Sequence, residues 1–164
     1  MIESHYCHLT SDQGNVTVTR CQPAPDMQVM FCGCSTSLTC LPVAAVCLFV
    51  QSESGDIMFP SAVQGSVSVV SGSGAVAAEK RVLGPSLDIS TDTGPISVAS
   101  CYSDQSKFST QTGDLDLKNV HNDSYVAVYT DSKVKMSGID GTANVFMKKG
   151  SLDIQISHVR HESR

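Results

Sequence analysis

Acidic side chains are the residues of this 164-residue chain whose types and spacing come closest to a catalytic site. Asp114, Asp116 and Asp153 could supply a pair of carboxylates, and glycosidases use two such groups across one glycosidic bond. Asp114 directly follows a turn glycine, however, where Asp favours local hydrogen bonds. No aromatic platform for a sugar and no cleft-forming loop is recognisable in the sequence. We therefore expect no catalytic residues and no enzyme, and an enzyme acting on a glycan-type polymer is the alternative.

Histidines occur in two pairs with the same three-residue spacing. His5 and His8 flank Cys7, and His158 and His161 lie close to the C-terminal end of the sequence. A structural zinc site needs four ligands, and neither pair has a third or fourth ligand nearby. We expect solvated histidines, no metal and no cofactor.

Two further patterns could suggest ion binding. Residues 72–74 are glycine-rich like a phosphate loop, but they lack the lysine and lead into a strand. Calcium-binding solenoid repeats carry an Asp in each copy. Here the Asp in the turns is intermittent, at Asp56, Asp92, Asp114 and Asp131. The sequence therefore predicts ordinary turns in both cases.

The seven cysteines are odd in number and unevenly distributed. Disulfide frameworks normally use an even number spread over the fold that they staple. Five cysteines fall in one short segment without the paired C-x-x-C spacing of a zinc ribbon: Cys21, Cys32, Cys34, Cys40 and Cys47. We expect free thiols in a reducing compartment.

The N-terminal residues carry no recognisable address. Residues 1–20 show neither a basic region followed by an apolar stretch nor an Arg-rich presequence. We expect a soluble intracellular protein, with a mitochondrial location as the alternative if an upstream presequence is missing, and secretion is disfavoured. The net charge of -5, without a basic run, argues against a nucleic-acid partner.

The longest uncharged stretch is residues 27–50. About 20 apolar residues can span a bilayer. Polar residues and Pro42 interrupt this stretch, and no Lys/Arg cluster follows it. We expect no membrane association, and a membrane-tethered protein through 27–50 is the alternative.

An internal repeat is the dominant pattern of the chain. The motif Ser/Thr-x-Ser/Thr-Gly-x-apolar-x-apolar occurs at 52–59, 71–78, 91–98 and 110–117. We expect structural turn glycines at Gly55, Gly74, Gly94, Gly113 and Gly150, with Lys133 in a degenerate copy. These positions are separated by 19, 20, 19, 20 and 17 residues.

Each repeat also predicts a strand before its turn. Apolar residues lie five and seven positions upstream of the glycine, as at Val67 and Val69 and at Leu87 and Ile89. Such alternation, bounded by turn residues, is typical of half-buried strands. Two short strands cannot close a core alone, so copies must stack. We predict an all-β, single-stranded, β-helix-like β-solenoid with two-strand rungs of about 20 residues, and an antiparallel sandwich is the competing fold.

Stacking makes a testable prediction about the outward positions between the apolar residues. It sets Asp88 beside Lys107, and Asp116 beside Lys135 beside Asp153. Opposite charges on neighbouring strands stabilise a pair by about 0.2–1 kcal/mol. The alternating signs of this cross-rung charge ladder favour the stacked arrangement.

The repeat frame at 52–59, 91–98 and 110–117 resembles the adhesin-type β-solenoid repeat family, whose function is unknown. The resemblance covers Gln51 to Ser157, about two thirds of the chain. This segment is similar in particular to a vertebrate member of that family. The resemblance implies the architecture only. The name implies surface adhesion in bacteria and is an analogy for an animal member. The family establishes no catalytic residues, so the resemblance implies none here.

The repeat divides the chain into four expected parts. Residues 1–20 form an isolated N-terminal rung around Gly14, 21–50 an irregular cysteine-rich hydrophobic segment, 51–157 the solenoid repeats, and 158–164 a disordered tail. Gly14 and Gly55 are 41 residues apart, about two periods, but no intermediate rung is recognisable. Our hypothesis is that 21–50 replaces native repeat sequence, as alternative splicing would, and that upstream or capping sequence is missing.

These observations favour a non-enzymatic binding or scaffolding module. Exposed sheet edges are natural docking points, and one is expected near residues 152–156. The expected partner is an unidentified protein or a second copy of the chain.

Overall fold

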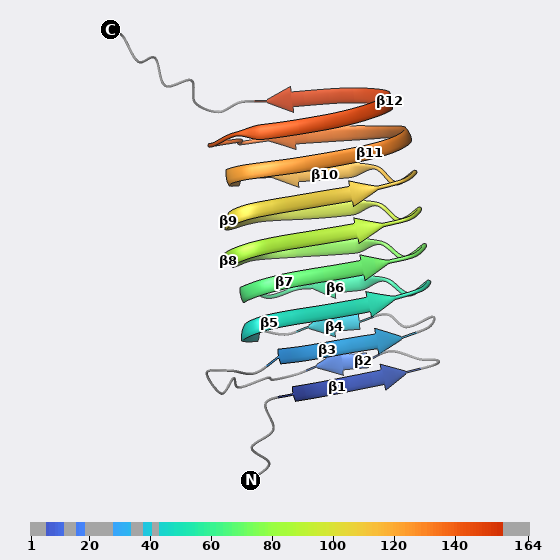
Figure 1. Cartoon of the computed structure of the whole chain (residues 1–164), viewed down its shortest axis with the longest axis vertical. Helices are drawn as coiled ribbons and strands as arrows, with labels where there is room; N and C mark the ends of the chain where they lie inside the picture. Colours follow the sequence, from blue (N-terminus) through green and yellow to red (C-terminus); the bar gives the residue numbers. More distant parts are fainter. Residues whose placement is uncertain (1–5, 12–15, 19–27, 34–37, 41–42, 156–164) are drawn as a thin grey trace, which may run out of the picture.

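The computed structural model describes the backbone of residues 6–11, 16–18, 28–33, 38–40 and 43–155, and the side chains of 47–121, 124–128 and 132–155. These residues form strands and no helix. Coils stack along the long axis, with β1 at one end and β12 at the other (Figure 1). The strands are β1 (Tyr6–Ser11), β2 (Val16–Val18), β3 (Gln28–Gly33), β4 (Leu38–Cys40), β5 (Val43–Ser52), β6 (Ile57–Phe59), β7 (Val63–Ser71), β8 (Val76–Thr91), β9 (Ile96–Thr110), β10 (Leu115–Lys118), β11 (Val120–Ser137) and β12 (Ala143–Gln155).

All pairings between these strands are parallel and follow the repeat. Ile57 lies opposite Val76, 19 residues further along, and Val76 lies opposite Ile96. β1, β3, β5 and β7 form the near side in Figure 1, and β2, β4, β6 and β10 the far side. β8, β9, β11 and β12 bend from the far to the near side or back. The predicted all-β solenoid is confirmed.

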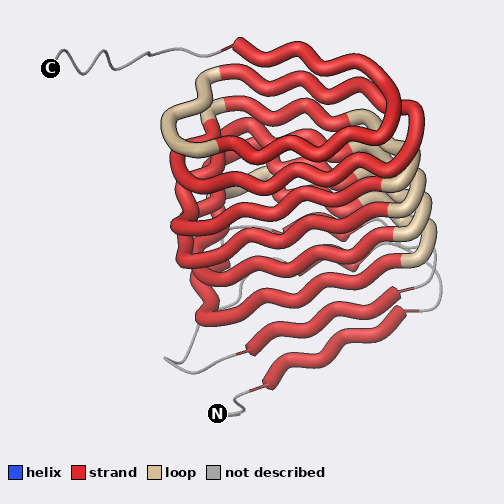
Figure 2. Tube along the Cα trace, turned by 45° about the horizontal axis from the view of Figure 1, so that its top comes forward, coloured by secondary structure: helices blue, strands red, loops and turns tan. Residues whose placement is uncertain are grey.

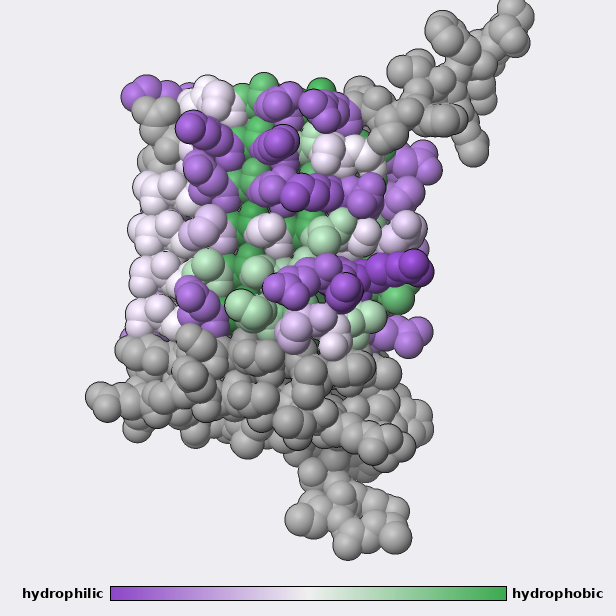
Figure 3. Space-filling view, turned by 180° about the vertical axis from the view of Figure 1, so that it is seen from behind, coloured by the Kyte–Doolittle hydropathy of each residue, from purple (hydrophilic) through white to green (hydrophobic). Residues whose placement is uncertain are grey.

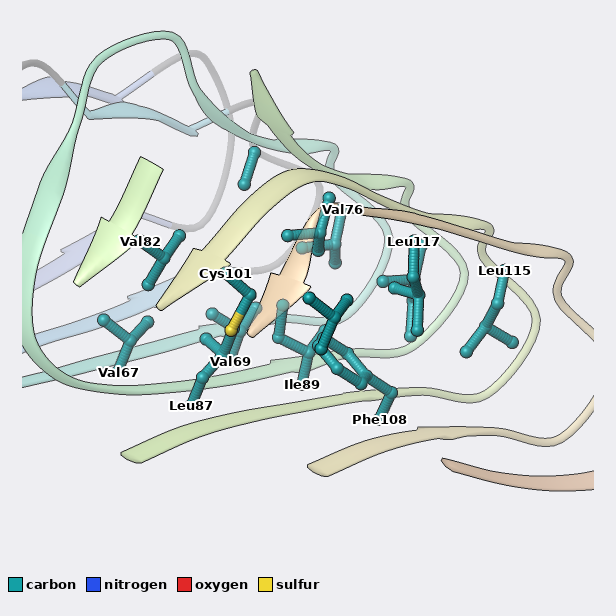
Figure 4. Close-up of a cluster of buried hydrophobic side chains, with 14 of the residues drawn as sticks. Val67, Val69, Val76, Val82, Leu87, Ile89, Cys101, Phe108, Leu115 and Leu117 are labelled. Atoms are coloured by element: carbon teal, nitrogen blue, oxygen red, sulfur yellow. The ribbon is translucent and has the colours of Figure 1, made fainter. Parts of the chain in front are cut away.

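The core is the inside of the coil. Val69, Ile89, Phe108 and Val126 follow one another in register and are at most 1% exposed. Leu115 and Leu117 approach them from the opposite side (Figure 4). Because side chains alternate along a strand, each coil contributes every second residue to this interior, and burial of those apolar residues holds neighbouring coils together.

A third inward position at the corner of each coil was not predicted. Val63, Val82, Cys101 and Val120 stack in register there and are at most 3% exposed. The repeat pattern predicts only two strands per coil, because this corner contributes a single buried residue between more exposed ones. Each coil is therefore closed on three sides rather than two.

The irregular segment expected over residues 21–50 differs from what the structure shows in its described part. β3, β4 and the start of β5 lie in this range, and Phe31 pairs with Leu9 on one side and Val50 on the other. An intermediate rung is thus present. It escaped recognition because Gly33 occupies the place of Ser52 in the register, and Thr36 stands where the repeat would place its glycine.

Buried hydroxyls fix the turns. The Ser or Thr that opens a turn donates to the carbonyl oxygen of the turn glycine three residues on: Ser52 to Gly55 (3.0 Å), Ser71 to Gly74 (3.0 Å) and Thr91 to Gly94 (2.8 Å). Backbone bonds such as Thr93 N to Gly72 O (2.9 Å) then join successive turns. The repeated Ser/Thr therefore satisfies the turn from inside the coil, where water is excluded.

Thr91→Val removes one of these buried donors while keeping the shape of the side chain. Because the Gly94 carbonyl then loses its bond to Oγ1, we expect the free energy of unfolding to fall by about 1–2 kcal/mol. Urea denaturation measures this. Thr93→Val in the exposed part of the same turn is the control, with an expected change within about 0.5 kcal/mol. Equal effects of the two substitutions would contradict the role of the inner hydroxyl.

The turn glycines are needed for close approach of one turn to the next. A Cβ on Gly74 would overlap with the carbonyl oxygen of Gly55, and one on Gly113 with that of Gly94. Gly150, also expected in a turn, lies instead within β12 with a φ of 128°, opposite Ser132. Gly14 is outside the described residues.

Candidate functional site

The carboxylates considered for catalysis have structural partners or stand apart. Asp114 Oδ1 accepts a hydrogen bond from the Lys133 backbone N–H at 2.8 Å, so this side chain ties one turn to the next coil. Asp116 Oδ2 lies 3.1 Å from the Lys118 ammonium. Asp153 is two rungs from Asp116. Among the described residues, no two of these three carboxylates face each other across a cleft.

The charge ladder is present in register and only partly in contact. Asp88 lies opposite Lys107, with 3.8 Å between Oδ2 and Nζ. Asp116, Lys135 and Asp153 also follow one another in register, but Asp116 pairs with Lys118 on its own strand. Hydrophilic side chains cover much of the far side of the stack (Figure 3). An exposed pair such as Asp88–Lys107 contributes little to stability.

A shallow hollow lies over the near side where this ladder continues. Its volume is about 360 Å³, and its lining spans four coils. Asp88, Lys107, Tyr125 and Asn144 follow one another in register along it. Ser86 and Gln105 complete its polar rim. The aromatic member was not predicted, because counting six residues back from Lys133 gives Ala127 as the outward position, whereas Lys107 pairs with Tyr125.

A second hollow of about 650 Å³ lies at the corner of the coils. Residues 60–62 and 79–81 form three-residue corners, whereas Ala99 and Ser100 make a two-residue corner on the next coil. The hollow lies where a three-residue corner is followed by a two-residue corner on the next coil. Glu79, Lys80 and Arg81 are exposed at its edge and carry both signs of charge. It contains no aromatic side chain in its lining.

His121, which was not among the predicted site residues, takes part in a small cluster. The rings of His121 and Tyr102 stack with centroids 4.3 Å apart and 11° between their planes. His121 Nδ1 lies 3.5 Å from Asp140 Oδ2. The position of His121 in the repeat could have identified it, because Tyr102, His121 and Asp140 each directly follow the buried corner residue of their coil. The cluster is partly exposed and includes no Ser or Cys side chain.

Cys101 is a core residue. It is completely buried, its Sγ lies 3.0 Å from Ser103 Oγ, and burial raises the pKa of its thiol. A raised pKa lowers the thiolate fraction, which is the reactive form. Cys47 is a free cysteine as well. The side chains of His5, His8, His158, His161 and the other cysteines of residues 1–46 lie outside those that the structure describes.

The C-terminal end of the stack exposes residues that are buried in every other described coil. β12 is the last strand of the sheet and pairs with β11 alone. Leu152 and Ile154 lie opposite Val134 and Met136, which are at most 1% exposed, yet they are themselves 47% and 39% exposed. Phe146 on the same strand is 54% exposed. This last coil is the upper rim of the described stack in Figure 2.

Two comparisons with known proteins found nothing and one found a family. A family model described as Toastrack DUF4097 matches residues 9–163. No curated protein and no solved structure matches the chain. Within the described residues, no helix is long and apolar enough to cross a membrane.

Proposed function

Because the chain belongs to the Toastrack DUF4097 family, a β-solenoid-like repeat family without an assigned activity, we propose a function from its exposed surfaces: a non-enzymatic binding module that docks through the open end formed by β12. The observation that carries the proposal is the exposure of Leu152 and Ile154, whose counterparts one coil earlier are buried. We propose an adhesin-like character for this chain in this sense only, as docking through its end.

The edge of β12 has the features of a docking strand. It is 13 residues long, and the backbone groups on its outer side have no strand to pair with among the described residues. Exposed edges of this kind pair readily with another strand. Partly buried Val145 and Met147 lie on one side of the coil, and Leu152 and Ile154 on the other. An occupant must therefore cover both sides of the open interior.

A second copy of the same end meets this requirement. A two-fold axis across the junction would set each segment of β12 antiparallel to the same segment of the other copy, which is the usual symmetry of a homodimer. Centred on Ser151, this pairing brings Lys149 of one copy beside Asp153 of the other, and Leu152 beside Gly150. Opposite charges then meet twice, and Ile154 lies beside the aliphatic stem of Lys148 of the other copy.

The dimer is tested by sedimentation equilibrium of the full chain and of Ile154→Lys. We expect a concentration-dependent dimer whose dissociation constant rises at least about tenfold in the variant, because burial of such a side chain is worth about 1.5–3 kcal/mol. Val70→Lys is the matched control, since Val70 is also 39% exposed but lies on β7, away from the end. It should leave dimerisation unchanged.

Three results would overturn the proposal. A wild-type chain that stays monomeric at high concentration has no such interface. Equal effects of the two lysine substitutions would move the interface elsewhere. Dimerisation that needs deletion of residues 158–164 would show that the chain covers its own end.

We also propose that the protein occupies an intracellular, reducing compartment. The free thiols of Cys47 and Cys101 support it, since free cysteines are typical of proteins in reducing compartments.

A further inference from the structure

The hollow on the near side combines an aromatic face with a dense set of polar groups. Tyr125 is 47% exposed, and beside it lie Lys107 on one coil and Asn144 on the next. Asp88 and Gln105 line the same hollow. Because neighbouring strands are about 4.8 Å apart, the column from Asp88 to Asn144 extends over about 14 Å. A ligand that uses the whole column is elongated along the stack.

We propose that this hollow binds a neutral oligosaccharide, with one sugar ring against the exposed face of Tyr125. The Asp88 carboxylate only accepts hydrogen bonds and the Lys107 ammonium only donates them, while Asn144, Gln105 and Ser86 do both. Hydroxyl groups can serve all of these partners. The polar groups thus fix orientation and the ring supplies apolar contact area.

Charged ligands fit this lining less well. An anion that approaches Lys107 also meets Asp88 at 3.8 Å from that ammonium, and a cation that approaches Asp88 meets Lys107. An extended peptide has no edge to add to here, because β8, β9 and β11 have a parallel neighbour on each side. A neutral polyhydroxylated chain avoids both problems.

The hollow is a binding site and not a hydrolytic one. Asp88 is the single carboxylate in its lining, whereas glycoside hydrolysis by the usual mechanism needs two flanking the bond. The site goes beyond the proposed docking at β12, since its aromatic centre lies on β11 and its charged pair on β8 and β9, and Asn144 is the one residue of β12 in its lining.

The test is titration of the full chain with cellohexaose, chitohexaose and mannohexaose, followed by isothermal calorimetry and saturation-transfer NMR. We expect saturable binding of at least one of the three. Tyr125→Ala should weaken it at least tenfold and Tyr125→Phe less than threefold, because the ring remains. Tyr102→Ala removes a comparably exposed tyrosine, 40% exposed, and should leave the affinity unchanged.

Each other outcome overturns the inference. Failure of all three oligosaccharides to bind at millimolar concentration excludes the ligand class, and binding that is insensitive to Tyr125→Ala places the sugar elsewhere. Cleavage of a bound oligosaccharide contradicts the binding-only role. Ile154→Lys should dimerise poorly and still bind sugar, so this inference and the dimer can fail separately.

Discussion

Gly94→Ala is expected to destabilise the protein by about 3 kcal/mol, a large effect for the addition of one methyl group. The new Cβ would overlap with the carbonyl oxygen of Gly74 and lie 2.6 Å from its carbonyl carbon. Both atoms are backbone, so no side-chain rotation relieves the contact. The turn cannot move outward cheaply either, because Thr91 Oγ1 holds the Gly94 carbonyl at 2.8 Å.

The measurement is urea denaturation followed by circular dichroism. Ser97→Ala is the matched control, since Ser97 is exposed on the strand that follows the same turn. Its stability should stay within about 0.5 kcal/mol of the wild type. A Gly94→Ala protein as stable as this control would show that the turns do not approach each other as closely as the stack requires.

Phe108→Ala is expected to cost about 3–5 kcal/mol, the range found when a buried Phe is truncated. Phe108 is 0% exposed and lies between Ile89 and Val126 in the register of the near side. Figure 4 shows it beside Ile89. Strands of the coils above and below hold the lining in place, so the cavity cannot collapse easily. Loss of dispersion contacts then adds to loss of buried area.

Thermal and urea denaturation of two variants test this value. Phe108→Leu keeps most of the buried volume and should cost less than half as much. Tyr125→Ala removes an equally large ring from the exposed side of the same sheet and should change stability by less than about 1 kcal/mol. Similar losses for Phe108→Ala and Tyr125→Ala would contradict the inside–outside assignment of this sheet.

The architecture was predictable because each coil repeats both its apolar alternation and its turn. A side chain at Gly74 or Gly94 would overlap with the backbone of the turn one coil earlier. This constraint recurs every 19 or 20 residues, so the spacing of the glycines reflects the stacking of the turns. The register of Asp88 with Lys107 followed from the same arithmetic. A periodic structure therefore leaves a periodic sequence, even where single motifs are short.

The rung within residues 21–50 was not predictable in the same way. The backbone of Phe31 pairs with that of Val50, but the sequence has Thr36 where the repeat motif would place its glycine. A search that depends on the turn motif misses such a rung, whereas the apolar pair Val29 and Phe31 was available as a weaker signal. Apolar periodicity is thus a more general sign of a coil than its turn.

The candidate surfaces depended on differences between coils rather than on the repeat. Tyr125 is an aromatic residue in a column that otherwise holds Ser68, Asp88, Lys107 and Asn144. Leu152 and Ile154 have the same types as buried residues and become exposed only because no described strand follows β12. Sequence patterns identify the inward positions, but only the end of the stack shows which of them stay uncovered.

Hydrogen exchange of the full chain at two protein concentrations tests the central claim, that the β12 end binds a second copy. The account predicts that amides of residues 143–155 exchange more slowly at the higher concentration, because pairing protects the outer edge of β12. Amides of β7, residues 63–71, are paired on both sides within one chain and should not change. Exchange in 143–155 that is independent of concentration would contradict the account.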